Sequence, residues 1–279
     1  MDALKKELWE LLRIFDHICR EEHIEYWVDY GTLLGAVRHQ GFIPWDDDID
    51  VSMRYEDYLR FFEVCDRYFP PNVRAVNYDR SKDCITPFRG YLQNTSILLE
   101  DVLGDTIMAF IDIFFYTGVP ENPYLRRLDQ IDMLWKSLRV TKTPLSEDKG
   151  NPVSRTAKKP SIVWSSITTI PNAPRGYSRA WKKKRRNARP CGPDSLISPG
   201  YSSPNDYSSS VVRASDVFPL SEVTFEGLTV MAPHNPDAYL RNQYGDYMQL
   251  PPEEQRQENM CSAFFRQTAE SPFREISSD

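Results

Sequence analysis

Four carboxylates fall within five positions of the chain, in the run Asp46-Asp47-Asp48-Ile49-Asp50. Side chains alternate between the two faces of a strand. A strand from Asp48 to Met53 would therefore project Asp48 and Asp50 the same way and bury the apolar residues between them. Two carboxylates on one face are well placed to share a hard divalent cation such as Mg²⁺, which suits a phosphate-bearing substrate. A solvated acidic loop is the alternative interpretation of the run alone.

Two further features of the sequence favour a functional site. The pair Gly31-Thr32 begins 17 residues before Asp48, and Asp112 lies inside the apolar run 109–115. An aspartate in so apolar a run is costly unless it is paired or bound to a metal. The candidate catalytic and metal-ligating residues are therefore Asp48, Asp50 and Asp112, with Asp46 as a further candidate ligand.

The layout resembles that of polymerase-β-like nucleotidyltransferases, which combine a Gly-Thr turn, a strand of alternating aspartates and a third aspartate on a neighbouring strand. Residues 27–53 resemble the LicD family more closely, through Gly-Thr-Leu-Leu-Gly-Ala-Val-Arg-His and Gly-Phe-Ile-Pro-Trp-Asp-Asp-Asp-Ile-Asp. A second match lies in residues 225–254, which contain Phe-Glu-Gly and Tyr-Gly-Asp-Tyr-Met. With the intervening strands, the resemblance covers most of residues 1–140 and 211–257.

The LicD family comprises phosphocholine transferases and relatives that include the fukutin-related ribitol-phosphate transferases. The resemblance implies a transferase that moves phosphocholine or a polyol phosphate from a CDP-linked donor to a glycan hydroxyl and releases CMP. It also implies products in surface glycans such as teichoic acid, capsule or lipopolysaccharide. Composition and spacing identify neither the cytidine, nor the choline, nor the acceptor.

Five further residues are candidates for substrate binding. Gly31 would let the backbone approach a ligand, and Thr32 would contact the ligand or cap the short helix that follows. Arg38 would clamp a phosphate or form a surface ion pair, and Trp45 would stack on a base or choline group or pack in the core. The family resemblance assigns Arg89 to a contact with the donor phosphate.

If the aspartates converge, they would hold one or two Mg²⁺ or Mn²⁺ ions that neutralise charge on the leaving group and activate the acceptor hydroxyl. Asp112 is the candidate to help deprotonate that hydroxyl. Two other classes of function stay open. A nucleotidyltransferase that uses an NTP on a sugar or another acceptor would release pyrophosphate. A non-catalytic protein would bind a metal or a glycan without turnover.

Hydrophobic spacing and turn residues predict an α+β fold, with a small mixed sheet flanked by helices. Helices are expected over residues 2–22, 33–37 and 55–68, and further helices after Asn122 and Asn235. Strands are expected over residues 25–30, 48–53 and 223–230, and several short strands within 73–115. The catalytic core is expected in residues 1–140, and 211–270 are expected to complete the same domain.

Residues 141–210 differ in composition from the rest. Within them, 151–210 hold 12 Ser, eight of the 21 Pro, and 11 Lys or Arg against two Asp. We expect a flexible basic insert, because so many prolines prevent a long helix, and this insert would allow peripheral contact with an anionic membrane. The remainder is acidic enough to bring the whole chain to a net charge of −6, which does not favour nucleic acid as a partner.

The 279 residues, 41% of them hydrophobic, suffice for a sizeable core. The sequence contains no run of about 18 apolar residues, so no membrane span is expected. The first residues lack the apolar segment of a signal peptide. The five cysteines are odd in number and widely spaced, which favours neither a disulfide framework nor a structural zinc site. We therefore expect a cytoplasmic protein.

Overall fold

The computed structural model describes residues 3–77, 79–80, 89–101, 106–126, 128, 191–199, 211–256, 261–266 and 274–275. Nine strands of this part form one sheet, and two more form a hairpin. The sheet contains β1 (Tyr26–Val28), β2 (Asp50–Arg54), β3 (Val73–Val76), β4 (Arg89–Asp101), β5 (Thr106–Val119), β6 (Leu196–Pro199), β7 (Val212–Arg213), β10 (Cys261–Arg266) and β11 (Arg274–Glu275). The hairpin contains β8 (Ser221–Phe225) and β9 (Leu228–Ala232).

The sheet is mixed because β2 and β5 run parallel, with Asp50 opposite Asp112, whereas their other neighbours are antiparallel. Its main path is β1-β2-β5-β4-β10-β11, while β3 pairs with β4, and β6 with β5 and β7. The prediction of short strands within 73–115 is wrong for β4 and β5. Both are long, with a register shift between Asn94 and Leu98 of β4, so the sheet is larger than predicted.

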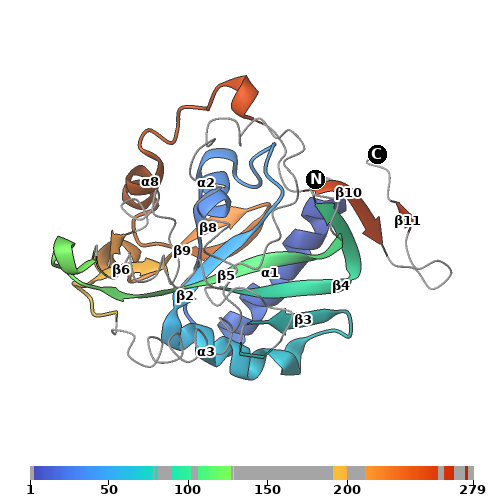
Figure 1. Ribbon diagram of the computed structural model, residues 1–279, viewed down its shortest axis with the longest axis horizontal. Helices are drawn as coiled ribbons and strands as arrows, with labels where there is room; N and C mark the ends of the chain where they lie inside the picture. The colour runs from blue at the N-terminus through green and yellow to red at the C-terminus, as the bar shows by residue number, and fades with distance from the viewer. Residues whose placement is uncertain are drawn as a thin grey trace, which may run out of the picture.

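The helices are α1 (Ala3–Glu21), α2 (Tyr30–His39), α3 (Tyr55–Val64), α7 (Ala214–Val217) and α8 (Pro236–Tyr244), with 3₁₀ helices η1 (Cys65–Tyr68) and η3 (Glu253–Gln255). Helix α1 packs on β4 and β5, and α3 on β2 and β5. In Figure 1, α2 and α8 lie above the sheet and α3 lies below it. Because α2 contacts both α8 and β8, C-terminal elements pack against the helix that follows β1. The predicted α+β class and the helices flanking a mixed sheet are confirmed.

The core follows the predicted apolar spacing. The apolar face of α1 is buried as expected, and it includes Leu8, Leu11, Leu12, Phe15, Ile18 and Cys19. Tyr58, Phe61 and Phe62 of α3 are also buried, and Tyr58 packs on Phe115 of β5 with ring centroids 4.9 Å apart. These aromatics belong to the core, as the sequence predicts.

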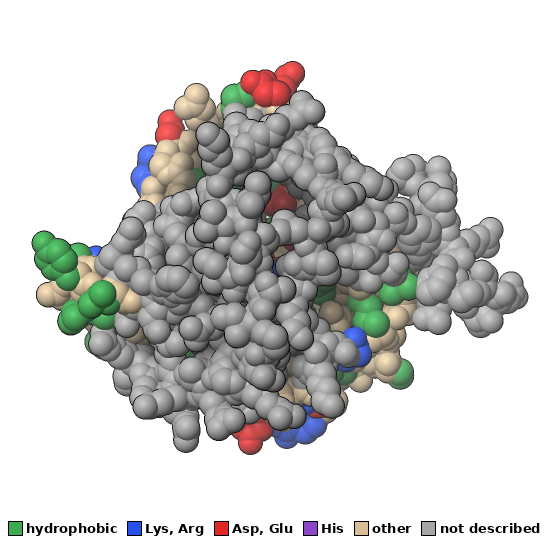
Figure 2. All heavy atoms as spheres, viewed as in Figure 1, with side chains coloured by type: hydrophobic (Ala, Val, Ile, Leu, Met, Phe, Trp, Pro, Cys, Tyr) green, Lys and Arg blue, Asp and Glu red, His purple; other side chains and the backbone are tan. Residues whose placement is uncertain are grey.

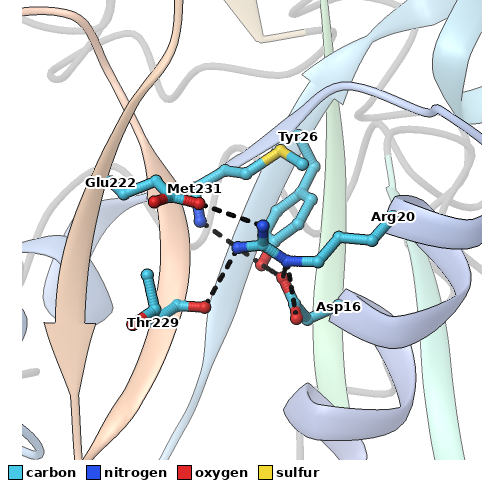
Figure 3. Close-up of polar contacts among 6 residues, drawn as sticks. All are labelled: Asp16, Arg20, Tyr26, Glu222, Thr229 and Met231. Atoms are coloured by element: carbon cyan, nitrogen blue, oxygen red, sulfur yellow. Dashed lines mark hydrogen bonds and ion pairs between the residues drawn. The ribbon is translucent and has the colours of Figure 1, made fainter.

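An ionic network joins the C-terminal hairpin to α1 (Figure 3). The buried carboxylate of Asp16 accepts hydrogen bonds from Arg20 Nε at 2.8 and 3.0 Å and from the Tyr26 hydroxyl at 2.6 Å. The Arg20 guanidinium also reaches Glu222 at 3.0 Å and the carbonyl of Thr229 at 3.1 Å, on β8 and β9. The network therefore fixes the hairpin against the N-terminal helix and β1.

Asp16→Ala is expected to lower the free energy of unfolding by about 3 kcal/mol, because the buried Tyr26 hydroxyl and the Arg20 guanidinium lose their acceptor. Urea denaturation followed by circular dichroism measures the loss. Glu10→Ala is the control, since it removes an ion pair with Arg13 whose two side chains are 41% and 51% exposed. Such a pair contributes less than about 1 kcal/mol. Equal losses in the two variants would contradict a stabilising role for the network.

The predicted insert 141–210 is only partly described. Its residues 196–199 form β6 and pair with β5, so this part belongs to the sheet, which corrects the predicted boundary there. Residues 129–190 and 200–210, including the basic run, lie outside the described residues, and most of the helix predicted after Asn122 lies there too. Its start is described: Asn122 Oδ1 accepts a hydrogen bond from the Tyr124 amide at 2.9 Å. None of the described helices is both long and apolar enough to cross a membrane.

Candidate active site

Aspartates gather at the beginning of β2. Asp50 opens this strand and lies opposite Asp112 of β5, and the Asp112 amide donates to the carbonyl of Ile49 at 2.9 Å. The predicted strand from Asp48 begins two residues later, so Asp46 and Asp48 lie in the preceding loop. On the face shown in Figure 2, acidic side-chain atoms are visible below the surface near the middle of the molecule.

Burial and mutual repulsion raise the pKa values of these carboxyl groups. Burial, and then repulsion from Asp46 and Asp112, raises the pKa of Asp48 to about 8. Burial, and then Asp48 and Asp112, raises the pKa of Asp50 well above its ordinary value. Burial raises the pKa of Asp112 to about 6, against the opposing effect of Arg89. The cluster therefore holds protons near neutral pH unless a cation neutralises it.

Arg89, at the start of β4, is the cation nearest to Asp112. Its Nη1 donates to Asp112 Oδ2 at 3.1 Å, and its Nε donates to the Tyr91 hydroxyl at 3.0 Å. The same Nε lies 3.1 Å from Asp112 Oδ1, yet this buried oxygen accepts no hydrogen bond from the described residues. The structure thus places the predicted phosphate contact Arg89 beside a candidate catalytic aspartate whose Oδ1 has an unused acceptor position.

The donor chemistry of the site fits a divalent cation. Carboxylate oxygens are the ligands that Mg²⁺ and Mn²⁺ prefer, and the buried Asp112 Oδ1 lacks a hydrogen-bond donor. As the side chains stand, no three His, Cys, Asp or Glu residues of the described part are arranged to hold a metal ion. Arg89 is paired with Asp112, and Asp46 shares a hydrogen bond with Asp48. Binding of a cation therefore requires these side chains to reorient.

The helix after β1 begins earlier than predicted. Because α2 starts at Tyr30, Gly31 and Thr32 lie in its first turn and not in a turn before it. The N-cap is Asp29, whose Oδ1 accepts a hydrogen bond from the Tyr30 amide at 2.8 Å, so the suggestion that Thr32 caps the helix is wrong. The Thr32 hydroxyl instead accepts a hydrogen bond from the Asp50 amide at 2.8 Å and thereby holds the start of β2.

Gly31 faces the acidic loop directly. A Cβ at this position would lie 2.5 Å from Asp46 Oδ2, so any other residue would displace the Asp46 carboxylate, and 3.9 Å from Asp48 Oδ1, which is an ordinary contact. The first amides of a helix lack intrahelical partners, so the amides of Gly31 and Thr32 are suited to an anionic ligand. The structure therefore brings both residues to the aspartates, and their contact with substrate stays a prediction.

The buried carboxylate of Asp29 was missed by the sequence analysis. Its Oδ2 accepts hydrogen bonds from the hydroxyls of Ser52 at 2.7 Å and Tyr116 at 3.0 Å, and its Oδ1 from Tyr239 at 2.9 Å and Gln243 at 3.4 Å. These partners come from β2, β5 and α8, so Asp29 fixes the C-terminal helix beside the acidic site. The available signal was an N-cap residue type directly before the Gly-Thr pair.

Glu226 connects the two stretches of family resemblance and was also missed as a site residue. Its Oε1 accepts a hydrogen bond from the Phe42 amide at 3.1 Å, and its amide donates to the carbonyl of Gln40 at 3.0 Å. A Cβ at Gly41 would lie 2.1 Å from Glu226 Oε1, so the close approach requires glycine. The hairpin turn therefore holds the loop that leads from α2 to the aspartates.

Arg38 and Trp45 are two predicted substrate contacts; Arg38 lies in the last turn of α2, and Trp45 lies in the loop that follows. Arg38 donates to the carbonyl of Tyr247 at 2.7 Å and to His39 Nε2 at 2.9 Å. The His39 ring meets the Trp45 ring edge-on at 6.0 Å, and the Arg256 guanidinium lies 5.4 Å from the centre of the Trp45 ring. Arg38 forms no ion pair with a described carboxylate, so the surface-ion-pair alternative is not observed there. Both roles in substrate binding stay predictions.

A protein-family model described as "LicD/FKTN/FKRP, nucleotidyltransferase domain" matches residues 23–94. This stretch contains β1, α2, the acidic loop and β2, and with them Asp46, Asp48 and Asp50. Residues 23–94 are therefore similar to a LicD-family nucleotidyltransferase domain. The fourth aspartate, Asp112, lies beyond the matched residues and is brought to them by the pairing of β5 with β2.

The similarity to a LicD protein extends over nearly the whole chain. The lipopolysaccharide cholinephosphotransferase LicD of Haemophilus influenzae is 28% identical over 262 residues, which cover 88% of this chain and 89% of that protein. An uncharacterised protein of Rickettsia prowazekii is 31% identical over 101 residues, 34% of this chain and 38% of that protein. Human ribitol 5-phosphate transferase FKRP is 38% identical over 52 residues, 19% of this chain and 10% of that protein.

Proposed function

We propose that this protein is a metal-dependent transferase with a polymerase-β-like nucleotidyltransferase fold. It moves phosphocholine or a polyol phosphate from a CDP-linked donor to a hydroxyl of a cell-surface glycan. The observation that carries the proposal is the pairing of Asp50 and Asp112 across the parallel strands β2 and β5, with Asp48 close by. Similarity to a cholinephosphotransferase over nearly the whole chain supports phosphocholine as the transferred group, and similarity to a ribitol 5-phosphate transferase supports the polyol alternative.

Asp48, Asp50 and Asp112 would hold the divalent cation, Mg²⁺ or Mn²⁺, with Asp46 as a further ligand. When bound, the cation would neutralise charge on the donor diphosphate and lower the pKa of the acceptor hydroxyl. The Arg89 guanidinium, displaced from Asp112, would pair with a phosphate oxygen of the donor, as its fork of donors allows.

Transfer forms a bond between the acceptor oxygen and the phosphorus of the transferred group, and the bridging P–O bond breaks so that CMP leaves. The proton of the acceptor hydroxyl passes to the Asp112 carboxylate, whose buried Oδ1 accepts no hydrogen bond from the described residues. The first-turn amides of α2 bind phosphate oxygens of the donor.

A thermal-shift screen tests the donor. CDP-choline, CDP-ribitol, CDP-glycerol, CTP and ATP are each added with Mg²⁺ or with EDTA, to the wild type and to Asp50→Asn. A donor at a hundred times its dissociation constant is expected to stabilise the protein by about 2.7 kcal/mol. This stabilisation is expected only for a CDP conjugate, only with the metal, and only in the wild type.

Product analysis separates the three classes of function. Release of CMP when the stabilising CDP conjugate meets a glycan acceptor supports the proposal. Release of pyrophosphate from CTP or ATP would contradict it in favour of nucleotidyl transfer. Binding of metal without turnover of any donor would contradict it in favour of a non-catalytic binding protein.

A further inference from the structure

Arg38, in the last turn of α2, and Arg256, directly after η3, have no acidic partner in the part of the chain that the structure describes. Neither Arg38 nor Arg256 forms an ion pair with any carboxylate of the described residues. Seven of the other described arginines do form such pairs: Arg13, Arg20, Arg54, Arg67, Arg80, Arg89 and Arg241. Arg38 and Arg256 are set apart from other unpaired arginines because they act on each other and have no ion-pair partner among the described residues.

Aromatic and main-chain contacts hold the two guanidinium groups. Arg256 stacks over the ring of Trp45 and donates from Nε to the carbonyl of Pro251 at 2.7 Å. Arg38 donates from Nε to His39, whose ring contacts Trp45, and from Nη1 to a carbonyl. Nη2 of Arg38 and both terminal nitrogens of Arg256 donate to no described residue. Both side chains are thus fixed while their remaining donors stay available to a ligand.

The two positive charges also act on each other. Burial, and then repulsion from Arg256, lowers the pKa of Arg38. Neighbouring guanidinium groups without a counter-charge are unfavourable, and an oxyanion that accepts hydrogen bonds from both relieves the repulsion. The contacts on the protein side are carbonyls, a histidine nitrogen and a π face, none of which supplies a full negative charge.

The arginines adjoin the aspartates without touching them. Arg38 follows Gly31 by seven residues, which places both on one face of α2, two turns or about 10 Å apart. Tyr244 interacts electrostatically with both groups: burial, and then the carboxylates of Asp29 and Asp50, raise the pKa of its hydroxyl, and Tyr244 in turn acts to raise the pKa of Arg38. The Tyr244 side chain is 44% exposed, so solvent reaches this part of the surface.

We propose that Arg38 and Arg256 form an anion subsite that binds a phosphate group of a substrate, beside the aspartates but separate from the phosphorus that reacts there. The inference rests on the proposed function, which supplies phosphorylated substrates. Trp45 positions Arg256 through its covered ring face and so does not receive a choline group on that face. The bound phosphate belongs either to the nucleotide part of the donor or to the acceptor glycan.

Titration calorimetry with inorganic pyrophosphate tests the subsite in metal-free protein, in EDTA at low salt. Without a cation to bridge the aspartates and the anion, the part of the binding that depends on Arg38 and Arg256 is measured by comparing the variants with the wild type. Arg38→Gln and Arg256→Gln are each expected to weaken binding at least about tenfold. Arg13→Gln removes the same charge from an exposed ion pair and is expected to bind like the wild type. No binding to the wild type, or an equal loss in Arg13→Gln, would overturn the inference.

Two further readouts keep the test independent of folding and of the transfer reaction. Arg256→Lys keeps the charge but loses the guanidinium fork and its contact with the Trp45 ring, so it is expected to bind pyrophosphate less tightly than the wild type and more tightly than Arg256→Gln; a loss as large as that of Arg256→Gln would overturn the inference. In a transfer assay, Arg256→Gln is compared with the wild type. A higher KM for the donor alone assigns the bound phosphate to the donor, and a higher KM for the acceptor alone assigns it to the glycan. An unchanged KM for both counts against the subsite. Absence of transfer with every donor refutes the proposed function, while the pyrophosphate titration still decides the subsite.

Discussion

Asp48→Asn and Asp50→Asn are each expected to slow group transfer at least about a thousandfold while the protein stays folded. The two carboxylates supply ligands for the cation of the proposed reaction. Loss of several kcal/mol of transition-state stabilisation corresponds to a rate loss of this size. Steady-state release of CMP measures the effect. The control is Asp194→Asn, which changes an exposed aspartate whose side chain forms no hydrogen bond or ion pair with the described residues. Near-full activity in either site variant would refute the assignment of the cluster.

The same substitutions are expected to stabilise the metal-free protein at pH 8. Burial and repulsion raise the pKa of Asp48 from 3.8 to about 8, so across this range the folded state holds a proton that the unfolded chain has released. The free energy of unfolding therefore falls as the pH rises from about 4 to 8. Asparagine does not titrate and removes this dependence.

Urea denaturation in EDTA at pH 5 and pH 8 measures the difference. Between these two pH values the wild type is expected to lose about 1 to 3 kcal/mol more than Asp48→Asn, since partial exposure reduces the full electrostatic effect. Parallel pH profiles for the two proteins would mean that Asp48 is not under electrostatic strain. A gain in stability together with a loss of turnover would distinguish a functional carboxylate from a structural one.

Asp29→Ala is expected to lower the free energy of unfolding by about 4 kcal/mol. Removal of the carboxylate leaves the buried Ser52 hydroxyl without its acceptor and also one of the hydroxyls of Tyr116 and Tyr239, which hydrogen-bond each other at 2.9 Å, and it removes the N-cap of α2. Chemical denaturation measures the loss. Tyr239→Phe is the matched comparison, because it removes one donor and keeps the acceptor, at an expected cost of about 1 kcal/mol. Similar losses in the two variants would show that the carboxylate does not organise this network.

The sequence pattern was sufficient to predict the elements whose defining residues lie close together in the chain. The apolar spacing of α1, the burial of Ile49 and Val51, and the start of α8 at the Asn235 cap all follow from residues a few positions apart. The meeting of Asp50 with Asp112 was also predictable, because a lone aspartate in an apolar strand requires a partner.

The missed features depend on residues far apart in the chain. In the sequence, Asp29 is only a polar residue at the end of a predicted strand. The side chains that donate hydrogen bonds to it belong to residues 52, 116, 239 and 243, which only the folded structure brings together. The contact of Glu226 with the loop at Gly41 and that of Arg256 with the Trp45 ring also join residues far apart in the chain. Residue types alone predicted an N-cap at Thr32, whereas the Asp50 amide competes for that hydroxyl.

The long-range partners of Asp29 also set when the protein can become functional during its synthesis. Tyr239 follows Asp29 by 210 residues, and translation at about 5 to 20 residues per second needs roughly 10 to 40 seconds to cover that distance. During this interval the nascent chain exposes a buried-type carboxylate without the hydroxyl of Tyr239 or the amide of Gln243. The aspartate-rich segment is thus synthesised early, but its supporting contacts form only after α8 has been synthesised. A ribosome that stalls before α8 leaves a chain without an organised site.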